Sequence, residues 1–545
     1  MIYTLYKYIF RELLRVFLLA LIALTLILSM GSILQPIQQY GAGPKQVVTF
    51  IFYFLPITLT FVLPIAALFA GSLVFGRFTS DNEFDACRAS GISIINLIIP
   101  GLFLAIVVAI SNLLLSFYVM PTFVHLAEKS IKADIKQMLF RSIEQKGYYK
   151  VPPKNDYLIY ADYVDHENDT LHGVVLTQLE GYEISDIYTT ESAKINIIPH
   201  DTTNEIKITI RNGYQMSDKQ TISLNSLPFT TEFGSLLADN ITFKKIDEMR
   251  KIKADLMRFE PVASAAYVAL KILTAELFAN DIQNHISKIP DSETDNENNQ
   301  TPEYFYELAG EPNSIRFSLV PCVSVDGEIK LTKEITLIVF DTKNPDNAHT
   351  YKCKEAYFRF EGSERDFVLA LDIRGARDIN TGEIKMWDSI TGLKIPKDVE
   401  KKRKLFYTDK GSINVNKLAD RNIGIVGFQS SDRLQNKQDI LNLKIQKTNA
   451  DIKGEMHSRL VFGIGCIPMI LIGIGLGILK RGGHLLSAFG ASCVPAAILI
   501  VCIMSGKQLT ENLGAQNVSG ISIMWAGCVV LFVIALSLYR YLLKH

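Results

Sequence analysis

Hydrophobic residues along this chain are concentrated in long runs near its two ends. A helix needs about 20 apolar residues to cross a bilayer core, and six runs are long enough. These runs cover residues 16–34, 47–76, 92–119, 460–479, 485–505 and 521–538, and none of them contains Lys, Arg, Asp or Glu. The pattern predicts an α-helical polytopic membrane protein with six transmembrane helices, three on each side of a polar middle block.

The middle block has the short apolar–polar alternation that is typical of β-strands. The alternating segments are residues 157–159, 174–176, 194–198, 205–210, 316–325, 335–340, 357–360 and 367–373. Helical spacing occurs instead at residues 128–146, 246–279 and 440–457, and the acidic, polar stretch 281–302 predicts a linker. We therefore expect a large β-rich, jelly-roll-like domain between helices 3 and 4.

Basic residues in the short connections favour one orientation of the six spans. The basic residues on the predicted cytosolic side are Lys7, Arg11, Arg15, Arg77, Arg88, Lys480, Arg481, Arg540 and Lys544, whereas the opposite side has only Lys45 and Lys507 near short loops. This bias places both termini in the cytosol and the middle block outside. The predicted regions are residues 1–127 with spans one to three, residues 128–456 outside the membrane, and residues 457–545 with spans four to six.

The polar connection between the second and third runs predicts a short helix over residues 79–91. Ser80 and Glu83 have the spacing of a capping box, and Gly91 supplies a left-handed stop. We expect Phe84 to lie on an exposed face and Arg88 to lie near the carboxyl end, where the helix dipole favours a cation. One interpretation is a docking site for a cytosolic partner. The other is that Glu83 only caps its helix.

A second polar cluster, Glu455-Met456-His457-Ser458-Arg459, directly precedes the fourth run. Glu455 and Arg459 are four residues apart and share one helical face. The simpler interpretation is an interfacial ion pair with the arginine extended toward lipid headgroups. The functional alternative is a hinge or latch where the external domain enters the membrane.

The chain carries no recognisable catalytic motif. It lacks a phosphate-binding loop, a nucleophile elbow and a zinc-protease motif, and its seven cysteines have no metal-ligand spacing. We predict no enzymatic activity, no metal site and no cofactor, and the zero net charge gives no support for nucleic acid as a partner. Cys322 and Cys353 are the only cysteines on the predicted outer side, so a disulfide between them is one hypothesis.

These features together resemble the LptF/LptG (YjgP/YjgQ) permease family of lipopolysaccharide export. The resemblance is carried by the run from Phe54 to Pro64, by Arg-Ala-Ser-Gly-Ile-Ser at residues 88–93, and by Glu455-x-His457-x-Arg459. It covers residues 1–215 and 451–545. The external part is longer than in that family, with the excess at about 246–440.

The resemblance implies a permease subunit of an ATP-driven ABC transporter in the bacterial inner membrane. Such a subunit pairs with a paralogous permease, and a cytosolic ABC ATPase dimer binds the ATP and magnesium. The helix with Glu83 would fit a groove in that ATPase. Lipopolysaccharide or a related glycolipid would enter through a lateral gate at which spans one and five each face their counterpart in the paralogue, here near Leu28, Gly31 and Pro495. It would then pass to periplasmic jelly-roll bridge proteins.

Two other functions fit the same topology. One is a mechanotransmission permease for lipoproteins or for cell-wall control, against which the division into three and three spans argues. The other is a membrane receptor with a periplasmic sensing domain, against which the short cytosolic loops argue.

Overall fold

The computed structural model describes most of the chain. It describes residues 2–544 except for 41–43, 151–156, 181–182, 200–203, 218–219, 234–239, 289–303, 326, 343–347, 362–366, 380, 383, 410, 423, 426–427, 429, 480–484 and 513–516. The chain divides into two compact units, Met1–Arg250 with Ala450–His545 and Lys251–Asn449. The second unit covers nearly the residues for which the sequence predicts an insertion.

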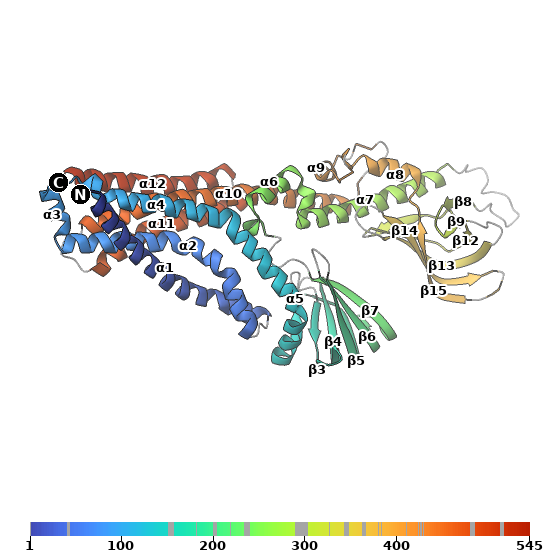
Figure 1. Ribbon diagram of the computed structural model, residues 1–545. Coiled ribbons are helices and arrows are strands. Elements are labelled where there is room, and N and C mark those ends of the chain that lie inside the picture. The colour runs from blue at the N-terminus through green and yellow to red at the C-terminus, as the bar shows by residue number, and fades with distance from the viewer. Residues whose placement is uncertain are drawn as a thin grey trace. The chain divides into compact units, whose positions relative to one another are not determined.

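The first unit contains a block of long apolar helices (Figure 1). They are α1 (Ile2–Tyr40), α2 (Pro44–Ser80), α4 (Ile94–Leu114), α10 (Asp432–Leu479), which begins in the second unit, α11 (Leu485–Glu511) and α12 (Asn517–Lys544). The short helix α3 (Glu83–Ala89) lies between α2 and α4. A π-helical turn, η1 (Leu115–Val119), joins α4 to α5 (Met120–Lys146), so the third span continues as one helix into the extramembrane part.

Seven of the described helices are long and apolar enough to cross a membrane, one more than the sequence predicts. The additional helix is α7 (Glu260–Ile286) of the second unit. Most of its side chains, including those of Leu270, Leu277 and Phe278, are buried. Because the Phe278 ring packs edge-to-face on Phe358 of the sheet, we interpret α7 as the core helix of a water-exposed domain. The other six helices coincide with the six predicted runs.

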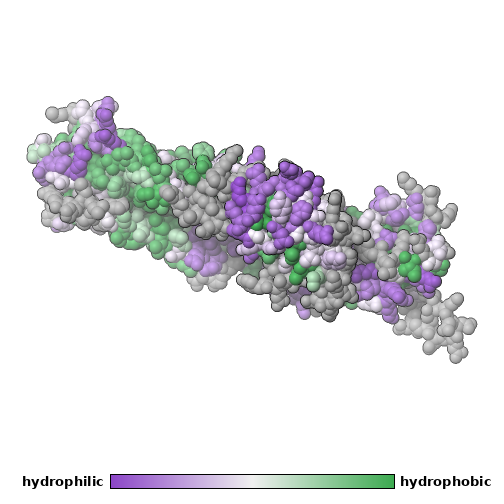
Figure 2. Space-filling view, turned by 90° about the horizontal axis from the view of Figure 1, so that it is seen from below, coloured by the Kyte–Doolittle hydropathy of each residue, from purple (hydrophilic) through white to green (hydrophobic). Residues whose placement is uncertain are grey.

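The helical block is held together by apolar packing with few polar contacts. One cluster joins Ile9 and Leu13 of α1 to Ala66 of α2, Leu97 of α4 and Ile470 of α10. A second cluster joins α10 to α11 and α12, with Leu499 and Leu531 fully buried. Large apolar side chains also remain exposed, and Figure 2 shows them gathered over this block. They include Leu19, Ile22, Phe103, Val501 and Leu536, which gives the block a surface suited to lipid or to partner helices.

The extramembrane part of the first unit is one antiparallel sheet packed against α5. Its strands are β1 (Tyr148–Lys150), β2 (Tyr157–Tyr160), β3 (Tyr163–Asp165), β4 (Thr170–Glu180), β5 (Glu183–Pro199), β6 (Asn204–Ser217) and β7 (Gln220–Phe233). The order is β1-β2-β4-β5-β6-β7, with β3 also paired to β4. Leu139, Phe140 and Ile143 of α5 form its core with inward-facing strand residues. The β-rich prediction is confirmed. The two facing sheets of a jelly roll are not confirmed, because the described strands of this unit form a single sheet.

Beyond β7, the helical elements are η2 (Ile241–Phe243), α6 (Ile246–Ala254), η3 (Leu256–Arg258), α7, α8 (Lys397–Lys404) and α9 (Val415–Leu418). The strands of the second unit are β8 (Phe305–Leu308), β9 (Asn313–Ser318), β10 (Cys322–Val325), β11 (Glu328–Leu331), β12 (Ile335–Asp341), β13 (Ala348–Glu361), β14 (Val368–Asp378) and β15 (Ile384–Leu393). These eight strands form one sheet.

The sheet of the second unit curls until its ends meet. The bridge between Gly310 and Leu393 connects the segment after β8 to the end of β15. Phe278 of α7 contacts Phe358 and Tyr306, with ring centroids 5.3 and 6.0 Å apart, so the helix fills the curled sheet. The predicted linker 281–302 is wrong at its start, because α7 continues to Ile286. Residues 289–302 lie outside the described chain.

Candidate functional site

The short helix α3 begins without the predicted capping box. Ser80 is the last residue of α2, so its hydroxyl cannot act as the N-cap of the next helix. Asn82 occupies the N-cap position in the left-handed conformation, with φ of 58° and no side-chain cap. The capping role proposed for Glu83 is therefore wrong. Glu83 is the first residue of α3, and its side chain is exposed.

The carboxyl end of α3 has the predicted glycine stop. Gly91 has φ of 81°, a conformation that glycine adopts without steric cost. Its N–H donates to the Arg88 carbonyl at 2.9 Å, and the N–H of Ile92 donates to the Cys87 carbonyl at 3.1 Å. This pair of bonds is a Schellman motif, which fixes the path from α3 into α4.

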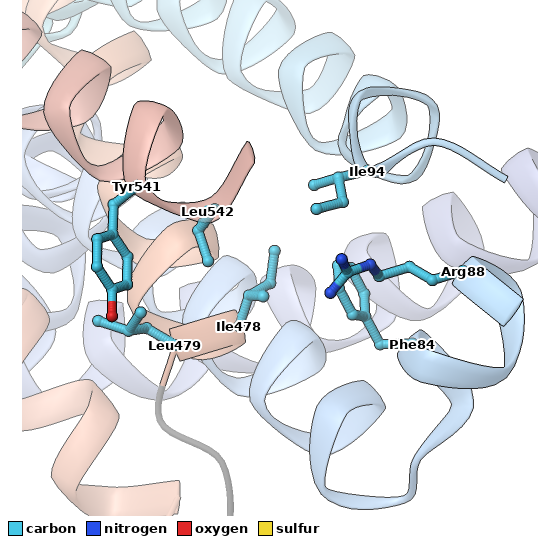
Figure 3. A pocket seen from close by; sticks show the side chains of 7 residues that line it. All are labelled: Phe84, Arg88, Ile94, Ile478, Leu479, Tyr541 and Leu542. Carbon is cyan, nitrogen blue, oxygen red and sulfur yellow. The ribbon is translucent and has the colours of Figure 1, made fainter. Parts of the chain in front are cut away.

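One side of α3 is anchored in the helical block, with a cavity of about 270 Å³ beside the anchor (Figure 3). The lining residues are Phe84 and Arg88 of α3, Ile94 of α4, Ile478 and Leu479 of α10, and Tyr541 and Leu542 of α12. Phe84 is only 1% exposed and belongs to the same apolar cluster as Ile94, Ile478 and Leu542. The predicted exposure of Phe84 is therefore wrong. A displacement of α3 would be transmitted through Phe84 to the ends of three long helices.

The second predicted cluster forms a buried polar site at the other end of the block. Arg459 of α10 is only 4% exposed. Its Nε donates to Glu455 Oε1 at 2.8 Å, and its Nη1 donates to the carbonyls of Ser116 at 2.9 Å and Lys244 at 3.2 Å. Its Nη2 donates to the Thr242 carbonyl at 2.7 Å. The predicted ion pair is present, but the extension of Arg459 toward lipid is wrong, because backbone carbonyls from distant segments surround the guanidinium.

Lys507 of α11 completes this site, which we call the Arg459 cluster (Ser116, Thr242, Lys244, Glu455, Arg459 and Lys507). Its Nζ donates to Glu455 Oε2 at 2.6 Å and to Thr242 Oγ1 at 3.1 Å. Glu455 is 5% exposed. One of its carboxylate oxygens accepts from Arg459 and the other from Lys507, so both are paired with a cation inside the protein. A buried carboxylate is tolerated only with such pairing. The sequence shows Lys507 only as a lone lysine near the outer end of span five and does not predict its part in this site.

The π-helical turn η1 supplies one acceptor of the Arg459 cluster. A π-turn interrupts the regular hydrogen bonds of a helix, and such turns occur often at functional sites. Here the Ser116 carbonyl points to Arg459, and the guanidinium lies over the Phe117 ring, 5.5 Å from its centroid. Arg459 therefore links the third span to the fourth at this level, in addition to their apolar packing.

His457 lies on another side of α10. The Nε1–H of Trp525 in α12 donates to His457 Nδ1 at 3.3 Å. Tryptophan can only donate, so His457 Nδ1 carries no proton in this contact. His457 therefore joins α10 to α12 and is not part of the Arg459 cluster.

The residues suggested for a lateral gate are placed on separate helices. Leu28 is 46% exposed on α1, and Pro495 is buried inside α11. The helix α1 continues past the predicted run 16–34 to Tyr40. The predicted gate lies between this chain and its paralogue, so it stays a prediction.

The disulfide between Cys322 and Cys353 is not formed. Both thiols are free and buried, and burial raises the pKa of Cys322 to about 11 and that of Cys353 to about 12. Cys322 lies opposite Leu331, and Leu331 lies opposite Ala356 on β13, so β11 separates the two cysteine strands. In the described part of the chain, no group of three metal-binding side chains could hold an ion.

Glycines on α10 form a feature that the sequence analysis missed. A Cβ at Gly473 would lie 2.7 Å from the Leu68 carbonyl oxygen, and one at Gly477 would lie 2.7 Å from the Ser72 carbonyl oxygen. Both oxygens belong to α2, so the two helix backbones are in close contact. Small residues at such spacing are typical of tight membrane-helix packing, and this spacing was the available signal.

This fold, with α3 and the Arg459 cluster, defines a multi-pass membrane protein with a β-sheet domain carried on its third span. Residues 7–304 match the family model described as lipopolysaccharide export system permease LptF/LptG. That match covers more than half of the chain, so the chain belongs to the LptF/LptG permease family. The matched residues include α3 and the seven-stranded sheet but not Glu455, Arg459 or Lys507. No curated protein matches the chain.

Proposed function

We propose that this chain is a permease subunit of an ATP-driven ABC transporter that extracts lipopolysaccharide, or a related glycolipid, from the inner membrane. The observation that carries the proposal is the anchoring of α3. Its Phe84 is buried among the ends of α4, α10 and α12, whereas Glu83 on the same helix is exposed. A partner that binds the exposed side of α3 and moves would therefore move three long helices.

The other parts of the proposal follow from family membership. Both termini and α3 face the cytosol, and the β-rich units face the periplasm. The partners are a cytosolic ABC ATPase dimer, a paralogous permease and periplasmic jelly-roll bridge proteins. ATP and magnesium are bound by the ATPase, and this chain performs no catalysis. Lipid enters at the seam with the paralogous permease, where α1 and α11 each face their counterpart, near Leu28.

The proposal is tested by purifying the full chain from its native membrane and identifying what comes with it. We expect an ABC ATPase, a second permease and a multiply acylated glycolipid, detected by mass spectrometry. An ATPase with lipoprotein in place of glycolipid would indicate the mechanotransmission function. Recovery of the chain without an ATPase would contradict the transporter function and favour a receptor.

Glu83→Gln is expected to weaken ATPase binding without unfolding the chain. Glu83 is exposed and caps no helix, and glutamine can keep the hydrogen bond that its side chain makes with Tyr8, so the fold should tolerate the loss of its charge. A charge-assisted hydrogen bond contributes roughly 1.5–3 kcal/mol, which corresponds to about tenfold or more in affinity. The measurement is ATPase binding to the purified permease pair.

The matched control is Glu191→Gln, the same change on an exposed residue of β5. It should leave ATPase binding unchanged. Equal ATPase affinity of the Glu83→Gln variant and the unmodified chain would show that Glu83 has no part in docking.

A further inference from the structure

The Arg459 cluster connects four segments that are far apart in the sequence. The Ser116 carbonyl comes from the third span, and the Thr242 and Lys244 carbonyls come from the segment that follows the seven-stranded sheet. Arg459 belongs to α10 and Lys507 to α11. The positions of the segment after the sheet and of three spans are thus linked by a few hydrogen bonds.

The two cations of the cluster are held differently. The Arg459 side chain is 3% exposed, and most of its acceptors are backbone carbonyls. The Lys507 side chain is 26% exposed and reaches only side-chain acceptors, Glu455 and Thr242. A second carboxylate, Glu511, lies one turn further along α11, with its Oε1 3.9 Å from the Lys507 Nζ. Lys507 can therefore exchange Glu455 for Glu511 by a change in its own flexible side chain.

At the level of Lys507, α11 is packed more closely on α12 than on α10. α11 is closely packed on α12, because a Cβ at Gly506 would lie 2.6 Å from the Gly520 carbonyl oxygen. Against α10 the contact is looser, since a Cβ at Gly454 would lie 3.6 Å from the Thr510 Cβ, an ordinary van der Waals distance. α11 and α12 therefore form one pair that borders α10 near Lys507.

We propose that Lys507 is a releasable contact that couples the position of α11 to the segment 240–250 leaving the seven-stranded sheet. With α11 in the present position, Lys507 bonds to Glu455 and Thr242 and holds that segment. When α11 moves away, Lys507 transfers to Glu511 on its own helix, and Arg459 is then the only cation of the cluster that still bonds to the segment. Because coupling is reciprocal, a rearrangement of segment 240–250 changes the preferred position of α11.

The test uses a disulfide that fixes α11 to α10. Gly454→Cys with Thr510→Cys places two Cβ atoms about 3.6 Å apart, within the range of disulfides. The purified full chain is compared in lipid nanodiscs with the bond oxidised and reduced, by hydrogen–deuterium exchange of the amides in residues 240–250. No ATPase and no glycolipid are present, so the result is independent of the proposed transport function.

Oxidation should slow exchange in residues 240–250 when Lys507 is present and should have no effect in the Lys507→Met chain. Lys507→Met alone should speed this exchange by about tenfold or more, as expected for loss of a charge-assisted hydrogen bond. Lys507→Arg, which can reach the same acceptors, should restore slow exchange.

The control is Lys544→Met at the exposed end of α12, which should change nothing in residues 240–250. An equal effect of oxidation with and without Lys507 would overturn the proposal, because the coupling would then run through other contacts. Unchanged exchange in the Lys507→Met chain would overturn it as well.

Discussion

Replacing Arg459 by methionine is expected to destabilise the first unit by about 3–5 kcal/mol, the cost of breaking a buried ion pair by removing one partner. The change leaves Glu455 buried, with Lys507 as its only cation in the cluster, and it removes the donor from the carbonyls of Ser116, Thr242 and Lys244. The measurement is the midpoint of thermal unfolding of the purified chain in detergent.

Two further variants separate the charge from the geometry. Arg459→Lys keeps the charge but presents one ammonium in place of the planar guanidinium. It cannot donate to all the carbonyls, so we expect a partial loss of stability. Glu455→Gln combined with Arg459→Met removes both charges. Because the residues are coupled, this double variant should be less destabilised than the sum of its two single variants.

The matched control is Arg421→Met. Arg421 also forms an ion pair, with Asp439, but its side chain is 61% exposed, and surface pairs contribute little to stability. The unfolding midpoint of this variant should stay close to that of the unmodified chain. An equally small change in the Arg459→Met variant would show that the Arg459 cluster is not a structural joint.

The features that the sequence predicted correctly are those that depend on neighbouring residues. The six uncharged runs give the long helices, because a helix satisfies its own backbone hydrogen bonds in lipid. The stop at Gly91 is set by the conformational freedom of glycine. The alternating segments near residues 157, 174, 194 and 205 lie in β2, β4, β5 and β6.

The features that the sequence did not predict depend on contacts between distant residues. The capping box failed because α2 continues through Ser80, so the residue chosen as a cap is already helical. Arg459 is buried by carbonyls of residues 116, 242 and 244, and no local pattern around residue 459 indicates them. The predicted disulfide is wrong because strand pairing decides which cysteines are neighbours, and β11 lies between the strands of Cys322 and Cys353.

Gly477→Ala is expected to separate α2 from α10 and to destabilise the helical block. The added Cβ would lie 2.7 Å from the Ser72 carbonyl oxygen and 3.0 Å from the Gly76 nitrogen. Both are backbone atoms in the interior of α2, so neither can move without shifting the helix. Overpacking of this kind costs about 1–3 kcal/mol, and Gly473→Ala, which meets the Leu68 carbonyl oxygen at 2.7 Å, should behave alike.

The control for this experiment is the same substitution at Gly490 of α11, where an added Cβ would meet nothing within 4 Å. In an open helical position, alanine is favoured over glycine by about 0.8–1.0 kcal/mol, so Gly490→Ala should be neutral or slightly stabilising. The thermal unfolding midpoints of the three variants are compared in one detergent. Alanine has a higher helix propensity than glycine at all three positions. A lower unfolding midpoint of the Gly473→Ala and Gly477→Ala variants would therefore reflect interhelical contact alone. If all three variants unfold at the same temperature, α2 and α10 do not depend on direct backbone contact, and the glycines of α10 have another role.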